Sequence, residues 1–241
     1  ERRSLVISEK EKETTAYHEA GHALVAFFLP GSDPIHKVTI IPRGRALGVT
    51  QQLPEDEKHT YPRSYLYNNL AILMGGRAAE EIALGQITTG AGNDIERATD
   101  MARKMVCEWG MSEKMGPLTY GTKEEQVFLG RDFNTQKNFS DETAKLIDLE
   151  VKALVMSGYA KAHDILNENR DSLERMAKAL LDLETLNLNQ MKDVIDGKAP
   201  GDGGGVVAEE KKSAKNEKNT RDVSEDGDFI PGAGLPDPSP A

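Results

Sequence analysis

Two histidines spaced four residues apart, His18 and His22, lie in the middle of a segment that the sequence predicts to be one helix. Apolar residues recur at helical spacing over residues 10–29, and Pro30-Gly31 then ends the pattern. Residues i and i+4 of an α-helix lie one turn apart on the same face, so both imidazoles can reach one metal ion. The pattern therefore predicts a rigid helical scaffold that holds both side chains.

The residues His18-Glu19-Ala20-Gly21-His22 form the pattern HExxH, which is typical of zinc peptidases. Zinc lowers the pKa of a bound water to about 7, and a glutamate beside the first histidine can take the proton. The resulting hydroxide attacks a carbonyl that the metal polarises. Such a short pattern also recurs by chance, and hydrogen-bonded core histidines are the alternative interpretation. Two histidines with an intervening glutamate are costly to bury without a purpose, which favours the metal site.

The composition limits the class of protein. The formal net charge is -10, which argues against a nucleic-acid partner. The single cysteine, Cys107, can form no intrachain disulfide, so we expect a reducing compartment, and its apolar setting predicts a core residue rather than a nucleophile. The sequence contains no signal peptide and no run of about 20 apolar residues. Because it starts at Glu1-Arg2-Arg3 without a methionine, we interpret it as a piece of a longer protein.

The hydrophobic pattern predicts a mainly α fold, a helical bundle with a small β-hairpin or sheet. β-Branched runs at 37–42 and 48–53 predict the hairpin. Further helices are expected at 62–84, at 95–109 after a loop at 88–94, from a cap at Ser140 to about Asn167, at 170–183, and in a short segment after Thr185. Gly75-Gly76 lower the propensity of the second helix, so we expect them to allow close packing against another backbone.

The character of the chain changes at Lys198. From there to Ala241, glycine, lysine, acidic residues and proline dominate. Such a composition cannot bury enough apolar surface to offset the conformational entropy of the chain. We therefore expect a folded domain at 1–197 and a disordered, low-complexity tail at 198–241.

Several further motifs follow one another along the chain. They are Thr14-Thr15-Ala16-Tyr17 before HEAGH, then VTIIPRG at 38–44, LGVT at 47–50, GGRAAEE at 75–81 and TTGAGND at 88–94. In this order they closely resemble the peptidase domain of the FtsH family, which comprises membrane-anchored ATP-dependent zinc metalloproteases. The resemblance covers about Glu1 to Asp196, and it implies that the expected folded domain is a zinc metallopeptidase.

A catalytic zinc site needs a third protein ligand. From the residues alone, Asp94 is an acidic residue near a helix start, and such acids are common. The FtsH resemblance implies instead that Asp94 joins His18 and His22 as a ligand, with water in the fourth position. Glu80 is the rival ligand, but the family pattern implies that it accepts the far N–H of a ligand histidine. Glu81 is interpreted as a surface acid or a further support.

The resemblance also implies an activity. The domain is expected to be a zinc-dependent endopeptidase in which Glu19 is the general base. The implied substrates are unfolded, misassembled or short-lived regulatory proteins, including membrane proteins. The strand containing Gly48, Val49 and Thr50 is a candidate site for an extended substrate, which would add to its edge. An internal hairpin strand is the alternative interpretation of this segment.

The sequence contains no GxxxxGK[ST] phosphate loop, so we expect ATP to bind only to the full-length protein. The resemblance further implies transmembrane helices and an ATPase module before this domain, a homo-hexamer, and a location on the cytoplasmic side of the bacterial inner membrane. One alternative is a catalytically inactive relative that acts as a scaffold, which would have lost one of the site residues. Another is a zinc enzyme for a small substrate, which would have a closed pocket instead of an open groove.

Overall fold

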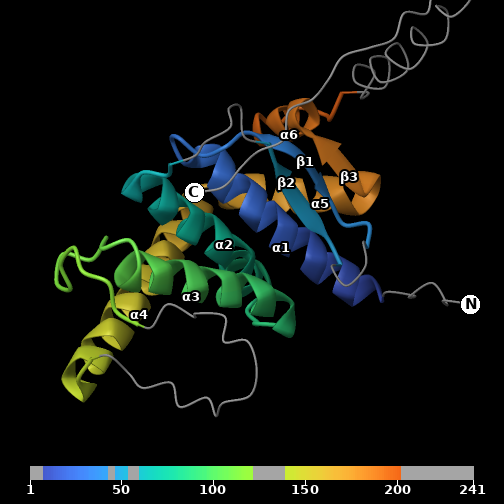
Figure 1. The fold of residues 1–241 in the computed structure, drawn as a ribbon. Coiled ribbons are helices and arrows are strands. Elements are labelled where there is room, and N and C mark those ends of the chain that lie inside the picture. Colours follow the sequence, from blue (N-terminus) through green and yellow to red (C-terminus); the bar gives the residue numbers. More distant parts are fainter. Residues whose placement is uncertain (1–7, 43–46, 54–59, 122–138, 202–241) are drawn as a thin grey trace, which may run out of the picture. The chain divides into compact units, whose positions relative to one another are not determined.

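The fold is mainly helical, with one small sheet (Figure 1). The structure is a computed structural model that describes residues 8–42, 47–53, 60–121 and 139–201. Its elements are α1 (Glu9–Phe28), β1 (Ile35–Thr39), β2 (Val49–Gln52), α2 (Arg63–Leu84), the 3-10 turn η1 (Thr89–Ala91), α3 (Gly92–Cys107), α4 (Asp141–Glu168), α5 (Arg170–Leu183), β3 (Thr185–Asn187) and α6 (Leu188–Ile195). The mainly α prediction is confirmed. The hairpin turn at 43–46 and nearly all of the expected tail, from residue 202, lie outside the described residues.

Helix α1 is the element around which the others pack. It begins with a capping box, in which Ser8 Oγ accepts the N–H of Glu11 and the Glu11 carboxylate accepts the N–H of Ser8. Its middle, including both histidines of the HExxH pattern, is buried against α2, α5 and the sheet. No helix among the described residues is long and apolar enough to cross a membrane.

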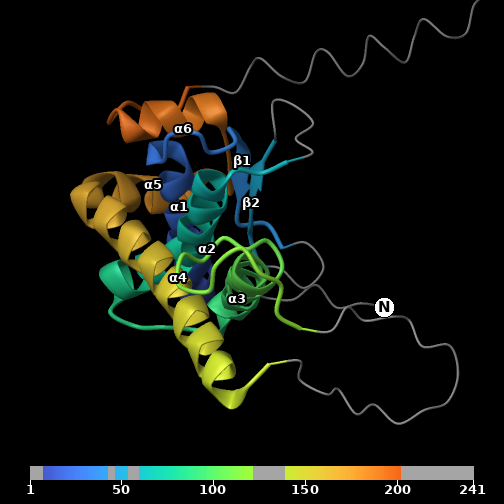
Figure 2. The same cartoon turned by 60° about the vertical axis from the view of Figure 1, so that its left-hand side comes forward.

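Helix α2 lies between α1 and α4, as Figure 2 shows from a second direction. Its contact with α1 is close because glycines meet there. A Cβ added to Gly21 would lie 2.4 Å from the carbonyl oxygen of Gly75, and a Cβ added to Gly75 would lie 2.9 Å from that of Gly21. The predicted close backbone packing is therefore confirmed for Gly75, and it brings α2 near the histidine face of α1.

The sheet has the strand order β2-β1-β3, with both pairs antiparallel. Val38 of the central strand is paired with Thr50 on one side and Leu186 on the other. The predicted hairpin is confirmed, and β2 is its edge strand within the described part of the chain. The third strand was not expected, because three residues are too few to show a periodic pattern and β3 forms by pairing with β1.

Helix α3 begins earlier than the sequence predicts, at Gly92 instead of Ile95. The preceding residues, expected to be an open loop, form the turn η1, in which Thr88 Oγ1 accepts the N–H of Gly90. Asp94 therefore lies in the first turn of a helix. The predicted cap of α4 is confirmed, since Ser140 Oγ accepts the N–H of Thr143.

Cys107, at the end of α3, is a buried member of the hydrophobic core. Burial raises the pKa of its thiol, because the charged thiolate loses hydration. Both observations agree with the prediction that Cys107 packs in the core and is not a nucleophile.

Candidate metal centre

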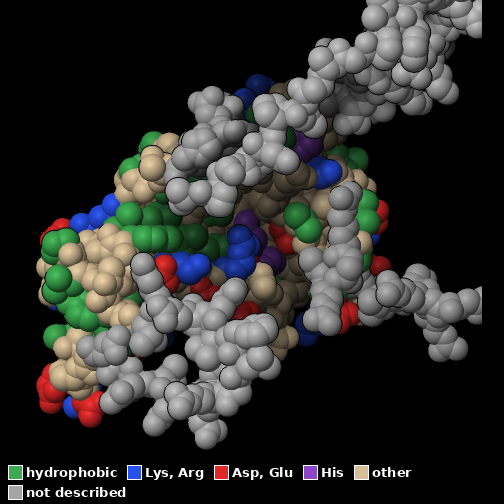
Figure 3. All heavy atoms as spheres, viewed as in Figure 1, with side chains coloured by type: hydrophobic (Ala, Val, Ile, Leu, Met, Phe, Trp, Pro, Cys, Tyr) green, Lys and Arg blue, Asp and Glu red, His purple; other side chains and the backbone are tan. Residues whose placement is uncertain are grey.

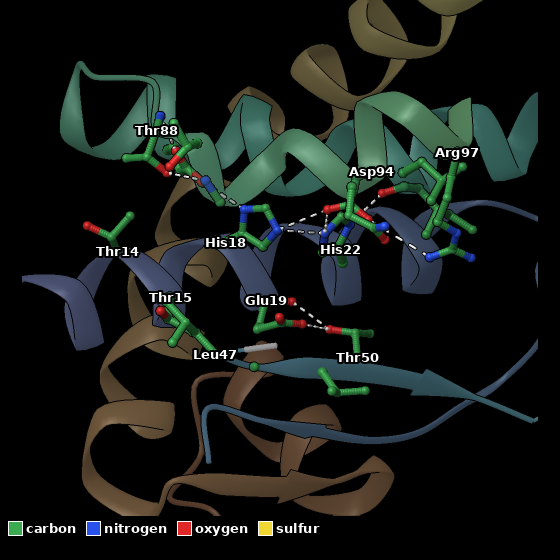
Figure 4. A pocket seen from close by; sticks show the side chains of 18 of the residues that line it. Thr14, Thr15, His18, Glu19, His22, Leu47, Thr50, Thr88, Asp94 and Arg97 are labelled. Carbon is green, nitrogen blue, oxygen red and sulfur yellow. Dashed lines mark hydrogen bonds and ion pairs between the residues drawn. The ribbon is translucent and has the colours of Figure 1, made fainter. Parts of the chain in front are cut away.

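Three side chains from two helices meet at one point of the fold. His18 and His22 come from the buried face of α1, and Asp94 comes from the first turn of α3 (Figure 4). The two Nε2 atoms lie 3.0 Å apart, and each is 3.2 Å from Oδ2 of Asp94. The residues singled out as metal ligands in the sequence are therefore brought together, although His22 and Asp94 are far apart in the chain.

The protons on the imidazoles decide whether a metal ion fits this cluster. His22 Nδ1 lies 2.7 Å from the carbonyl oxygen of Ile72, which only accepts, so Nδ1 must donate. His18 Nδ1 lies 2.7 Å from Oε1 of Glu80 and likewise donates to it. A neutral imidazole has one N–H, so both Nε2 atoms present lone pairs. When both imidazoles are neutral, two nitrogen lone pairs and a carboxylate oxygen converge without a proton between them, and a nitrogen–oxygen set of this kind suits Zn²⁺.

The cluster attracts positive charge even when no metal is bound. Burial lowers the pKa of the His18 imidazole, but its hydrogen bonds with Asp94 and Glu80 outweigh burial and raise this pKa to about 9. Burial raises the pKa of the Asp94 carboxyl, yet its hydrogen bonds with the two imidazoles hold the value well below its usual range. A proton thus occupies the metal-free cluster at neutral pH.

Glu80, the rival ligand, lies on the other side of the His18 ring. Its side chain is almost wholly buried on α2, where Oε1 accepts from His18 Nδ1 and Oε2 accepts the N–H of Thr88 at 2.9 Å. Burial raises its pKa, but the bonds from His18 and Thr88 outweigh burial and lower it, so the carboxylate stays charged. Glu81 points elsewhere and is hydrogen-bonded to Tyr159. Of Asp94, Glu80 and Glu81, only Asp94 lies next to the Nε2 atoms of the two histidines.

Glu19 lies beside the cluster and faces the sheet. Its Oε2 accepts a hydrogen bond of 2.7 Å from Thr50 Oγ1 on β2, as Figure 4 shows. Gly48 stands next to it, and a Cβ at this position would lie 2.6 Å from Cγ of Glu19. The glycine therefore leaves room for the carboxylate between α1 and the strand.

A cavity of about 1080 Å³ surrounds these groups. It is lined by α1, by Gly48 and the strand β2 that follows it, and by the first turns of α3. Figure 3 shows histidine atoms within a hollow of the surface, next to Lys or Arg side chains. Arg97, also in the lining, is largely exposed, with Nη1 4.0 Å from Oδ1 of Asp94. The site formed by His18, His22 and Asp94 is thus reached from a cavity that is bounded on one side by the edge strand β2.

Known proteins similar to this chain show which family it belongs to. The family model "Peptidase family M41" matches residues 5–194. The chain belongs to peptidase family M41. Among curated proteins, this M41 domain is 59% identical over 198 residues to "ATP-dependent zinc metalloprotease FtsH" of Acidobacterium capsulatum, covering 82% of this chain and 31% of the relative. It is 53% identical over 227 residues to the protein of the same name from Magnetococcus marinus, covering 94% of this chain and 33% of the relative.

The resemblance to the FtsH family inferred from the motifs is therefore confirmed, and the chain is a zinc metalloprotease domain of the FtsH type. The M41 domain spans about a third of the length of these curated relatives.

Several contacts at the centre of this M41 domain were not predicted from the sequence. The Ile72 carbonyl orients His22, the Thr88 N–H holds Glu80, and the Thr50 hydroxyl holds Glu19. A backbone carbonyl or N–H has no sequence pattern of its own. Gly76 was expected to pack against a backbone, but it meets the His18 ring instead: a Cβ there would lie 2.5 Å from Cε1.

Replacing Gly76 by alanine is expected to displace the His18 imidazole, because the added methyl group overlaps three atoms of the ring. Overpacking of this kind costs about 1–3 kcal/mol of stability, and zinc binding should weaken as well. Urea unfolding and competition with a chelator measure the two effects. Gly92→Ala is the matched control, because φ is −59° there and no atom lies within 4 Å of the added Cβ. If the two variants had equal stability and equal zinc affinity, the close contact between position 76 and the His18 ring would be contradicted.

Proposed function

We propose that this chain is the zinc-dependent endopeptidase part of a membrane-anchored, ATP-dependent protease that degrades unfolded, misassembled or short-lived regulatory proteins. The observation that supports this most directly is the convergence of His18 Nε2, His22 Nε2 and Asp94 Oδ2 at 3.0–3.2 Å, with both Nδ1 atoms already donating elsewhere. Glu19 lies on the same helix and lines the same cavity, which supports its proposed role as the base.

In this proposal His18, His22 and Asp94 hold Zn²⁺. The bound ion supplies Lewis-acid chemistry, because it acidifies water and polarises the scissile carbonyl. Glu19 takes a proton from the attacking water at its carboxylate and then gives it to the leaving amine. Glu80 and the Ile72 carbonyl keep the two imidazoles in the tautomer that presents Nε2 to the metal.

We further propose that Gly48 and the first two residues of β2, Val49 and Thr50, bind the substrate. These residues line the cavity, and within the described residues β2 has a hydrogen-bonded neighbour on one side only. An extended peptide can add to such an edge through main-chain hydrogen bonds, which favours a polypeptide over a small substrate.

The relatives are named as ATP-dependent, and the resemblance to the FtsH family implies further parts of the full-length protein. We propose that ATP binds to an ATPase module in the full-length protein and that a membrane segment there anchors it to the bacterial inner membrane, with this domain on the cytoplasmic side. We also propose a homo-hexamer. Three exposed apolar residues of α4 support an assembly, because Leu146, Leu149 and Met156 recur at helical spacing.

The test measures cleavage of a labelled unfolded protein in the presence of ATP. It compares the zinc-loaded full-length protein with the same protein treated with a chelator. Cleavage is expected only with zinc, and it should return when zinc is added back, because the metal supplies the Lewis acid. A small ester serves as the comparison substrate. Zinc binding without any cleavage would favour the scaffold alternative, and turnover of the ester alone would favour a small-substrate enzyme.

A further inference from the structure

The hydroxyl of Thr50 lies between two oxygen atoms of one residue. Thr50 Oγ1 is 2.7 Å from Oε2 of Glu19 and 3.1 Å from the backbone carbonyl oxygen of Glu19. A hydroxyl has one proton and donates it mainly to one acceptor. The carbonyl lies inside α1, where it already accepts a helical N–H. The bond to Oε2 is also the shorter one and is therefore the stronger of the two.

Gly48, the residue just before β2, also restricts the Glu19 side chain. A Cβ at position 48 would lie 2.6 Å from Cγ and 2.7 Å from Oε1 of Glu19. The carboxylate thus lies directly against the backbone at Gly48, with the Thr50 hydroxyl two residues further along. The strand itself is held in place, because Thr50 is paired with the fully buried Val38 of β1.

From these contacts we propose that Thr50 is a positioning residue for Glu19. Its hydroxyl holds Oε2, so that Oε1 remains to take the proton; no hydrogen bond between described residues reaches Oε1. A glutamate side chain has several rotatable bonds, and a fixed carboxylate avoids the loss of rate that misplaced groups cause. The inference rests on the proposed peptidase function and adds a role for β2 beyond substrate binding: the strand also orients the base.

The test compares Thr50→Val, which keeps the shape of the side chain but lacks the hydroxyl, with Thr50→Ser, which keeps the hydroxyl. The substitutions are made in the full-length protein, and cleavage of a labelled unfolded protein is measured with ATP. Thr50→Val is expected to lower kcat by about 10- to 100-fold and to change KM by less than about 2-fold. Thr50→Ser should retain kcat within about 3-fold. Zinc content should be the same in both variants. Thr99→Val is the matched control, because the Thr99 hydroxyl donates to the Ile95 carbonyl within α3.

The outcomes separate this inference from the proposed function. If the wild type cleaves and Thr50→Val has an unchanged kcat, or a changed KM alone, the positioning role is overturned while the peptidase stands. If the wild type does not cleave, the proposed function fails, and the contact is tested by thermal unfolding of the zinc-free proteins. Thr50→Val and Glu19→Ala, singly and combined, should then shift the Tm non-additively, since both remove one contact. Additive shifts overturn the inference.

Discussion

Replacing Glu19 by glutamine is expected to lower kcat for peptide cleavage by about 10³-fold or more, which corresponds to about 4 kcal/mol in the activation barrier. Glutamine has nearly the same shape, and its amide oxygen can still accept from the Thr50 hydroxyl. It cannot take a proton from water. The loss should therefore appear in kcat, while zinc content and the unfolding transition stay close to those of the wild type.

Glu13→Gln is the matched control for this experiment. Glu13 lies on the same helix, is exposed to solvent, and should be replaceable without loss of activity. Cleavage rates are measured with an unfolded protein and with a short peptide, so that a defect in substrate delivery is distinguished from a defect in chemistry. If Glu19→Gln retained more than about a tenth of the wild-type kcat, Glu19 would not be the general base.

Replacing Asp94 by alanine is expected to abolish zinc retention and, with it, cleavage. The substitution removes the carboxylate oxygen that lies 3.2 Å from both Nε2 atoms, so only two protein ligands remain. Zinc content after dialysis against a weak chelator measures the loss directly. Asp100→Ala, at an exposed position of the same helix, is the matched control and should retain the metal.

Glu80→Gln distinguishes a ligand from its support. Because Glu80 contacts Nδ1 of His18 and not the Nε2 cluster, its replacement should weaken zinc binding by about 10- to 100-fold without abolishing it. If Asp94→Ala kept zinc at full occupancy while Glu80→Gln lost it, the two assignments would be reversed.

Most of the fold could be predicted because its helices are long and each buries one apolar face. The bounds predicted for α5 agree with the structure to the residue, and Ser140 caps α4 as expected. One strand and the first turn of one helix were not predicted. Strand β3 is formed only by its pairing with β1, and the first turn of α3 contains Gly92 and Asn93, which have poor helix propensity. In both cases tertiary contacts outweigh the local preference.

The sequence also predicts part of the candidate centre. The spacing of His18 and His22 places them on one face, because this follows from the repeat of the helix alone. No local rule relates either histidine to Asp94, and this ligand was inferred only from the family resemblance. Its role, like those of Glu19 and Glu80, is a prediction that the variants above test. The strand at Thr50 was singled out for substrate binding, but its contact with the Glu19 carboxylate follows from the packing of β2 against α1.

The sequence by itself therefore determined the helix α1, the pair of imidazoles on its face, and the glutamate between them. Only the tertiary structure decided which acid meets which nitrogen. Helices α2 and α3 approach α1 from different sides of the His18 ring, so Glu80 reaches Nδ1 and Asp94 reaches Nε2. The physical reason is that the two ring nitrogens point in different directions. The role of each carboxylate therefore depends on where packing places its helix, which no spacing along the chain records.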